Sequence, residues 1–355
     1  MPGHSSGAAG HAGQPPAAAS RAETGIVVPR AGLLAGLLGL AFLLTAVGLA
    51  IGPVPLPPAR VLAALFAAGS ADGIIVTEIR LPRVLLALLV GAALALSGAA
   101  LQGLMRNPLA EPAVIGTSGF AALGAVIALY FGLADRFPPA QPLGGIAGAL
   151  TGIVLLRALT GRDASAATLI LAGVALGSLA GSGVALALNL APNPFAALEI
   201  AFWLLGSLED RSFLHVGLAV LPLTAGCLLL LGAGRALDAL SLGEDVARSL
   251  GVSVGAVRVR IVVGVGLAVG AAVAVTGLIG FLGLVVPHLI RPLVGHRPAA
   301  ILLPSALAGA CLLLAADILV RVVPTATELK IGIVTALIGV PFFLALIVRA
   351  RHRLI

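Results

Sequence analysis

The sequence predicts an all-α membrane protein of about ten transmembrane helices. Of its 355 residues, 60% are hydrophobic and only 10% are charged. Several apolar runs reach the roughly 20 residues that a helix needs to cross a bilayer. Soluble domains of this length could not bury so much apolar material in their cores.

Apolar runs and the breaks between them predict the spans in order. They lie near residues 32–52, 84–105, 113–132, 141–159, 166–190, 212–233, 256–276, 278–294, 300–322 and 331–349. The eighth span is the least distinct, because it is short and only Gly277 separates it from the seventh.

An even number of spans places both termini on the same side of the membrane. With the termini in the cytoplasm, the inner segments hold 14 basic residues and the outer segments hold 7, which satisfies the positive-inside rule. Basic residues between apolar runs indicate topology rather than a nucleic-acid surface. Residues 1–30, rich in Gly, Ala, Pro and Ser, are predicted to be a disordered cytoplasmic tail, and residues 31–355 form the membrane domain.

A short pattern occurs twice in the chain. GAALALSG (Gly91 to Gly98) aligns with GAAVAVTG (Gly270 to Gly277), and the same offset brings Pro108 onto Pro287 and Gly116 onto Gly295. The copies begin in spans two and seven, so units of spans 2–5 and 7–10 would have opposite orientations. Such inverted repeats are typical of transporters. Chance similarity between helices rich in Ala, Gly and Val is the alternative.

Span five carries small residues at helical spacing. Gly173, Gly177 and Gly181 recur every four residues, with Ser178 beside them. Such a stripe permits close approach of another helix. It would equally leave room for a bulky solute, so both packing and pathway lining stay open.

Residues 237–252 form the most charged stretch between two spans. Apolar residues alternate there with Glu244, Asp245 and Arg248 at roughly helical spacing, between Gly243 and Gly251. A short amphipathic helix of this kind lies on lipid or docks into a groove of a soluble partner. The acidic pair argues against an anionic leaflet.

The chain lacks an energy-converting motif of its own. A phosphate-binding loop ends in GK[ST], but the single lysine, Lys330, is followed by Ile331. We therefore expect no catalytic residue, no metal ligand and no cofactor on this chain, with any ATP used by a partner subunit. An ion-coupled secondary transporter would need acidic groups inside the membrane. Asp317 comes nearest, and Arg321 one helical turn later predicts an ion pair.

An enzyme hypothesis rests on GTSG (Gly116 to Gly119), which has the GxSG form of intramembrane serine proteases. Ser118 would be the nucleophile and His288 its base. Four small residues in a chain this rich in Gly and Ala are weak evidence.

Several motifs in order resemble the FecCD-type permeases, the membrane subunits of type II ATP-binding-cassette importers for ferric siderophores, haem and cobalamin. The motifs are RLPR (80–83), the 91–98 run, Gln102, NPLAEP (107–112), LSLGEDVARSLGV (240–252), IGFLGLVVPHLIR (279–291), AADILVR (315–321) and GIVTALIGVPFF (332–343). The resemblance implies a homodimer in the bacterial inner membrane. It also implies two cytoplasmic ATPase subunits and a periplasmic substrate-binding protein.

Residue roles follow from the same resemblance. Arg80, Arg83 and Arg321 match arginines that meet glutamates of the binding protein, although anchoring of span ends is an alternative. The 237–252 segment matches the family's coupling helices, with ATPase contacts at Leu242, Gly243, Glu244, Ala247, Leu250 and Gly251. The family commonly enters span ten through ELPVG, where this chain has Lys330 in place of proline.

The resemblance thus predicts import of a bulky iron chelate by alternating access. Span five and the start of span ten would line the pathway. Overall similarity favours haem, and no motif separates haem from a ferric siderophore or cobalamin. The alternatives are a cobalamin importer and, from another class, the ion-coupled secondary transporter.

Overall fold

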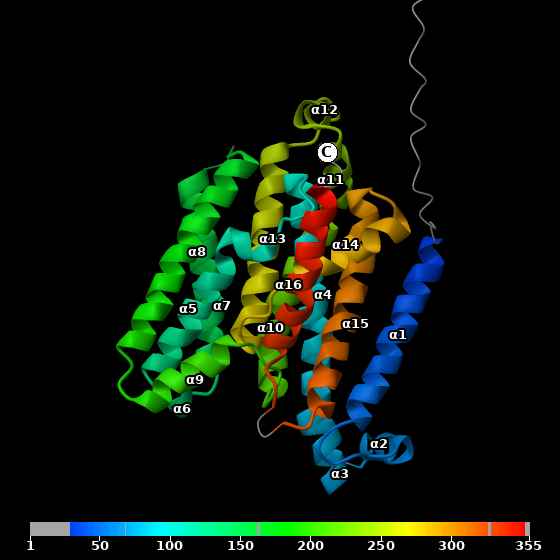
Figure 1. The fold of residues 1–355 in the computed structure, drawn as a ribbon, viewed down its shortest axis with the longest axis vertical. Helices are drawn as coiled ribbons and strands as arrows, with labels where there is room; N and C mark the ends of the chain where they lie inside the picture. Colours follow the sequence, from blue (N-terminus) through cyan, green and yellow to red (C-terminus); the bar gives the residue numbers. More distant parts are fainter. Residues whose placement is uncertain (1–28, 68, 162–163, 326–327, 352–355) are drawn as a thin grey trace, which may run out of the picture.

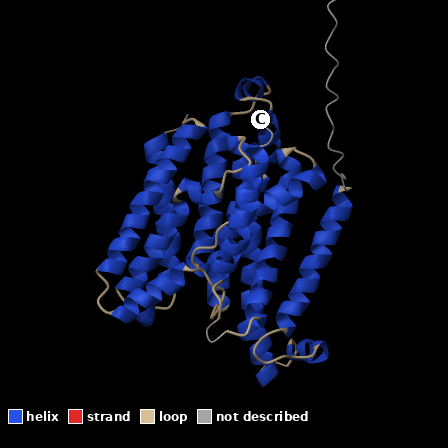
Figure 2. Cartoon of the chain, in the orientation of Figure 1, coloured by secondary structure: helices blue, strands red, loops and turns tan. Residues whose placement is uncertain are grey.

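A computed structural model describes residues 29–67, 69–161, 164–325 and 328–351, and every regular element in these ranges is a helix (Figures 1 and 2). Most of the predicted tail, residues 1–28, lies outside the described residues. The all-α prediction is confirmed.

Ten helices correspond to the ten predicted spans. They are α1 Arg30–Ala50, α4 Leu81–Met105, α5 Thr117–Tyr130, α7 Ala140–Thr160, α8 Ala166–Asn189, α10 Phe213–Leu231, α13 Val254–Thr276, α14 Leu282–Val294, α15 Pro298–Val322 and α16 Ile331–Arg351. Among the described residues, seven helices are long and apolar enough to cross a membrane, while α5, α14 and the apolar part of α16 are shorter.

Eight further elements in the described part of the chain are shorter than the spans or connect them. They are α2 Pro58–Ala64, α3 Ala71–Ile74, the π-helix η1 Ile75–Arg80, the 3₁₀ turn η2 Pro112–Ile115, α6 Leu133–Arg136, α9 Pro194–Leu204, α11 Gly234–Ser241 and α12 Glu244–Ser249. Figure 1 shows α12 at one end, called here the α12 end, and α2, α3 and α6 at the other, the α3 end. Helix α1 begins and α16 finishes toward the α12 end, as an even number of spans requires.

The first helices of the two repeat units form the centre of the molecule. Helices α4 and α13 are the most deeply buried spans, whereas α1 and α8 expose most of their surface. Helix α4 packs on α14 and α15, and α13 packs on α5 and α7. Each unit thus inserts its first helix between the second and third helices of the other unit. This exchanged packing agrees with the inverted repeat.

The second helix of each unit is short, and in both units a residue with a left-handed backbone conformation precedes it. Helix α5 has 14 residues and α14 has 13, and each follows a residue with positive φ, Gly116 (79°) or Phe281 (68°). Non-helical backbone therefore occupies part of the depth of both units. The sequence placed the start of span eight at 278, but the helix begins only at Leu282.

The offset that aligns α4 with α13 fails beyond that helix. Pro108 lies in the loop before η2, whereas Pro287 lies inside α14. Gly116 precedes α5, and its structural counterpart is Phe281 rather than Gly295, which follows α14. The expected pairing of these residues was wrong, because the linkers after α4 and α13 differ in length.

Glycines permit the close crossings at the centre. A Cβ atom at Gly91 would overlap the backbone of Gly309 in α15, and one at Gly98 would overlap the carbonyl of Gly283 in α14. In the other unit, a Cβ at Gly270 would overlap Ala149 of α7. Helices in lipid gain no hydrophobic free energy from association, so such close van der Waals packing carries much of their stability.

Replacement of Gly98 by alanine should therefore destabilise the fold. The added methyl group has no space beside Gly283, and overpacking of this kind costs roughly 1–3 kcal/mol. We expect a lower apparent Tm in detergent, measured by size-exclusion chromatography after heating. The control is Gly39→Ala in α1, where no atom lies within 4 Å of the new Cβ. Equal Tm values for the two variants would contradict this account of the crossing.

Candidate functional site

A buried carboxylate organises the polar residues of the α3 end. Asp317 of α15 is fully buried, and its Oδ1 atom accepts a hydrogen bond of 2.8 Å from Nε of Arg83 in α4. Its Oδ2 atom forms an ion pair with Arg321, one helical turn further along α15. The Asp317–Arg321 ion pair predicted from spacing is confirmed.

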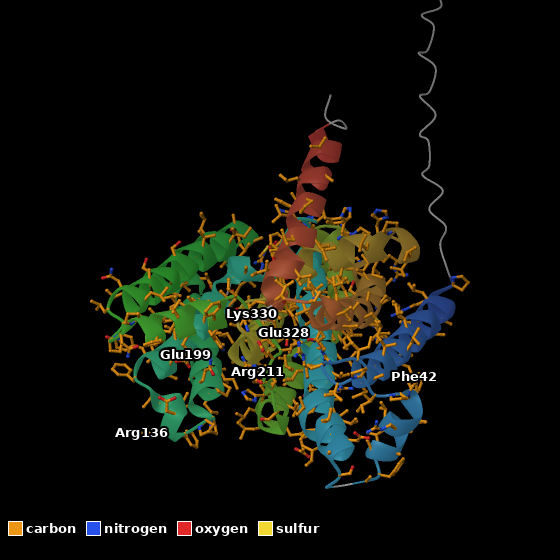
Figure 3. The ribbon with its side chains drawn as sticks, turned by 60° about the horizontal axis from the view of Figure 1, so that its bottom comes forward. Phe42, Arg136, Glu199, Arg211, Glu328 and Lys330 are labelled. Carbon is orange, nitrogen blue, oxygen red and sulfur yellow. The ribbon has the colours of Figure 1, made fainter. Side chains whose placement is uncertain are left out.

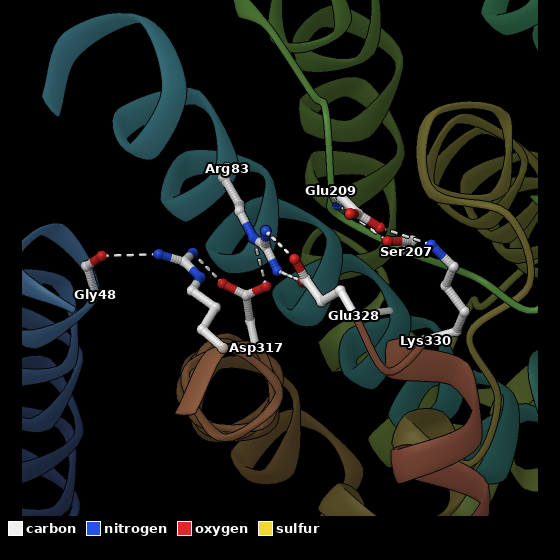
Figure 4. Close-up of polar contacts among 8 residues, drawn as sticks. Gly48, Arg83, Ser207, Glu209, Asp317, Glu328 and Lys330 are labelled. Carbon is white, nitrogen blue, oxygen red and sulfur yellow. Dashed lines mark hydrogen bonds and ion pairs between the residues drawn. The ribbon is translucent and has the colours of Figure 1, made fainter. Parts of the chain in front are cut away.

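A second carboxylate completes the group. Glu328, in the segment that leads into α16, holds the guanidinium of Arg83 with both oxygens, one of them at 3.1 Å from Nη1 (Figure 4). We call Arg83, Asp317, Arg321 and Glu328 the arginine–carboxylate cluster. Its two positive and two negative charges compensate one another, as buried charges must.

Two arginines also hold the end of α1. Nη1 of Arg321 donates to the carbonyl of Gly48 at 2.8 Å. Nη1 of Arg80 donates to the carbonyls of Leu49 and Ala50 at 2.7 and 2.8 Å, and its Nη2 donates to Val54. The last carbonyls of a helix lack internal partners and carry partial negative charge, so these guanidinium groups stabilise the end of α1. The π-helix η1 ends at Arg80 and so sets its position.

A separate ion pair fixes the residue that departs from the family pattern. Nζ of Lys330 lies 2.6 Å from Oε2 of Glu209, in the loop between α9 and α10. The same loop meets two further segments through its backbone, since Ser207 N–H donates to Thr276 at 2.7 Å and Gly332 N–H donates to Gly206 at 3.3 Å. The entry to α16 is therefore tied to α4 by Glu328 and to the α9–α10 loop by Lys330 (Figure 4).

Several of the charged residues of the α3 end line a cavity of about 480 Å³. Its charged lining comprises Arg80, Arg83, Glu209, Asp210, Arg211, Arg321 and Glu328. The cavity lies between the loop after α1, the start of α4, the α9–α10 loop and the end of α15. Figure 3 shows Arg211, Glu328 and Lys330 gathered in the middle of the α3 end, while Arg136 and Glu199 lie toward its edge.

The structure thus brings together the three arginines predicted to dock a binding protein. Within this subunit, however, Arg80 and Arg83 are 4% and 9% exposed, and all three have internal partners. Docking stays a prediction, and these contacts add a role in holding the subunit together. Sequence reasoning missed Glu328, Glu209 and Arg211. Their position could have been a signal, because charged residues cluster just before the sixth span (Glu209 and Arg211) and just before the tenth span (Glu328).

The predicted coupling residues lie in α12 and in the turns on either side of it, at the α12 end. Leu242 and Leu250 are 66% and 63% exposed, and Val246 is exposed between them. Gly243 and Gly251 bound α12 with positive φ angles of 116° and 80°, which glycine adopts without strain. Glu244 forms ion pairs with Arg248 and with Arg258 of α13.

One predicted contact residue faces inward instead. Ala247 is fully buried on the inner side of α12. Its side chain therefore packs α12 against the rest of the subunit and is not accessible to a partner. Leu242, Val246 and Leu250 are the exposed apolar residues of α12 and the turns beside it.

The glycine stripe of α8 divides into two parts. A Cβ at Gly173 would overlap the carbonyl of Val114 in η2, and Gly177 lies against Gly116, so this part serves close packing. A Cβ at Gly181 would meet no atom within 4 Å, and Ser178 and Ser182 are exposed. Pathway lining stays a prediction, restricted to this second part of the helix.

The two residues of the protease hypothesis lie on different helices, Ser118 on α5 and His288 on α14. The His288 ring packs edge-to-face against Phe342, with ring centroids 5.6 Å apart. Ser118 lies in the first turn of α5, beside the buried Thr117.

Comparisons with known proteins agree with this architecture. The model of the FecCD transport family matches residues 39–349. The vitamin B12 import system permease protein BtuC of Vibrio vulnificus is 39% identical over 318 residues, which is 89% of this chain and 93% of BtuC. The hemin transport system permease protein HmuU of Yersinia pestis is 40% identical, covering 78% of this chain and 84% of HmuU.

A solved structure has the same fold. It is described as an inward-facing conformation of an ABC transporter of the metal-chelate type. It matches with a TM-score of 0.79 and 33% identity, covering 90% of this chain and 99% of that chain.

Loss of the Asp317 charge should destabilise the subunit strongly. In Asp317→Asn, Arg83 and Arg321 lose their shared carboxylate in a buried site, which typically costs about 3–5 kcal/mol. The apparent Tm in detergent should fall, and removing one arginine as well, in Asp317→Asn with Arg321→Gln, should recover part of the loss.

The matched control is Asp72→Asn. Its partner Arg60 is exposed, and exposed ion pairs contribute at most about 1 kcal/mol. If Asp317→Asn and Asp72→Asn had the same apparent Tm, the arginine–carboxylate cluster would not be a main contributor to the stability of the fold.

Proposed function

Because the chain belongs to the FecCD transport family, whose members are permeases of ATP-binding-cassette transporters, we propose that it is the membrane subunit of a type II importer for a bulky metal chelate. The proposed assembly is a homodimer with two ATPase subunits and a substrate-binding protein. The α12 end would face the cytoplasm of a bacterial inner membrane, and the α3 end would face the periplasm. The excess of basic residues on the inner segments supports this orientation.

One structural observation carries the proposal beyond family membership. At the α12 end, a short helix held by the ion pair of Glu244 with Arg258 exposes Val246, and the turns on either side of it expose Leu242 and Leu250. An apolar surface of this size fits a groove on a soluble protein. The ATPase subunit is the partner that such a permease requires, because this chain has no phosphate-binding loop.

The substrate is proposed from two sources. The relatives named above carry vitamin B12 and hemin in their names, and the solved structure is of the metal-chelate type. Haem or a ferric siderophore is our proposal, with haem favoured by overall similarity, and cobalamin is the alternative. The exposed Gly181 and Ser178 offer only small groups to a solute, so affinity would reside in the binding protein.

Transport would proceed by alternating access. The two repeat units exchange their central helices α4 and α13, so opposed tilts of these units would open one side while closing the other. The binding protein and the nucleotide would each favour one of the two states.

Purification from native membranes in mild detergent tests the proposal. We expect a stoichiometric soluble subunit with a phosphate-binding loop, identified by mass spectrometry, and ATPase activity that binding protein loaded with haem, ferric siderophore or cobalamin stimulates. In Leu242→Asp with Leu250→Asp, that subunit should be lost, because the introduced carboxylates oppose apolar contact. Leu62→Asp is the control, since Leu62 is 62% exposed at the opposite end. A chain that purified alone and transported on a proton gradient would refute the importer.

The cluster generates a second prediction, about docking of the binding protein. Glu328 already occupies Arg83, so a glutamate of the binding protein must compete with it. In Glu328→Gln the neutral amide holds the guanidinium less strongly. Docking should therefore tighten by about fivefold, equivalent to roughly 1 kcal/mol.

Docking affinity can be measured by surface plasmon resonance on the reconstituted complex. Glu199→Gln, which removes an exposed carboxylate elsewhere on the α3 end, should leave the affinity unchanged. Weaker docking of Glu328→Gln would mean that Glu328 builds the contact surface instead of competing for it.

A further inference from the structure

The four arginines that line the cavity at the α3 end differ in their partners. Arg80 is held by three backbone carbonyls, those of Leu49 and Ala50 in the last turn of α1 and that of Val54 after it. Arg83 is held by Asp317 and Glu328, and Arg321 by Asp317 and the carbonyl of Gly48. The fourth, Arg211, forms no hydrogen bond or ion pair with any residue that the structure describes. Its Nε atom is buried without a partner.

The acidic residues next to Arg211 in sequence do not pair with its guanidinium group. Glu209 is engaged by Lys330 at 2.6 Å, and Asp210 is exposed. Asp210 also has a φ angle of 56°, a left-handed conformation that reverses the chain just before Arg211. Burial lowers the pKa of the Arg211 guanidinium, while the charges of Asp210 and Glu209 raise it.

The chemistry of this group defines what it can bind. A guanidinium offers parallel N–H donors that match the two oxygens of a carboxylate. A buried donor without a partner is unfavourable in the free subunit, so a ligand that supplies the missing acceptor gains affinity from it. The lining carries four arginines and three carboxylates, and its paired neighbours Lys330 and Asp317 add one charge of each sign, so one positive charge remains in excess and favours one further negative charge.

We propose that Arg211 receives a carboxylate side chain of the substrate-binding protein, and that it is the docking arginine that is available before any internal hydrogen bond or ion pair opens. The inference rests on the proposed function, because it assumes an acidic docking protein at the α3 end. It adds a residue that the family motifs do not assign.

Position favours a protein side chain over the carboxylate of a solute. Arg211 shares its cavity with Arg80, Arg83 and Arg321, the residues predicted to face the binding protein. Figure 3 places it in the middle of the α3 end, beside Glu328 and Lys330, where a docked surface would reach it.

The test compares Arg211→Gln with Arg136→Gln in the full complex in nanodiscs. Arg136 is an exposed arginine at the edge of the same end. The probe is the substrate-binding protein that stimulates the wild-type ATPase, and docking is measured at 50 and at 300 mM salt. We expect Arg211→Gln to weaken docking at low salt by about tenfold or more and to flatten its salt dependence, while Arg136→Gln stays within about twofold.

Two further readouts separate docking from structure. Because Arg211 has no internal partner among the described residues, Arg211→Gln should keep the wild-type apparent Tm, and a fall in Tm would assign Arg211 to the fold and overturn the proposal. Arg211→Lys keeps the charge but not the fork, so it should recover only part of the affinity. Arg211→Glu should abolish docking of the wild-type binding protein. Among variants of the binding protein in which one acidic residue of its docking face is replaced by arginine, one should restore docking to Arg211→Glu.

The outcomes distinguish this inference from the proposed function. Failure of the wild-type complex to bind any substrate-binding protein would refute the importer itself. Wild-type docking by Arg211→Gln, together with tighter docking by Glu328→Gln, would overturn only the role of Arg211. Normal docking with a raised KM for uptake would also overturn it, because Arg211 would then meet the solute.

Discussion

The charge of Asp317 is the constraint on which the α3 end depends. A carboxylate without solvent is tolerated only when fixed positive groups surround it, and here those groups come from two helices. Arg83 brings α4 to α15, and Arg321 carries the connection on to α1. Glu328 then uses the remaining face of Arg83 to hold the entry of α16. Elements that are far apart in sequence are thus joined through one buried anion.

At the centre of the molecule, the equivalent constraint is steric. The helices cross where Gly91, Gly98 and Gly270 leave no side chain between two backbones. Helices in lipid gain no hydrophobic free energy when they associate, so close van der Waals packing at these crossings provides the stabilising free energy instead. Packing at the centre and charge compensation at the α3 end therefore stabilise different parts of the subunit.

The sequence predicted what depends on local pattern. Ten apolar runs gave ten helices, and the spacing of Asp317 and Arg321 gave their ion pair. The start of α14 was missed because residues 278–281 are as apolar as a helix, while their backbone is set by contacts with distant segments. One such contact is the hydrogen bond from Phe281 N–H to the carboxylate of Glu111. The pairing of Arg83 with Glu328 joins residues 245 positions apart, and no spacing rule reaches that far.

The ion pair between Glu244 and Arg258 joins α12 to the second turn of α13. Helix α13 has 23 residues and is therefore about 34 Å long. At its other end, the carbonyl of Thr276 accepts the hydrogen bond from Ser207, in the loop that carries Glu209 and Arg211. Helix α13 therefore connects the α12 surface at one end of the molecule with the loop that lines the cavity at the α3 end. If α13 moves as a unit, a partner bound at α12 and a ligand bound at Arg211 would each change the binding free energy of the other by the same amount.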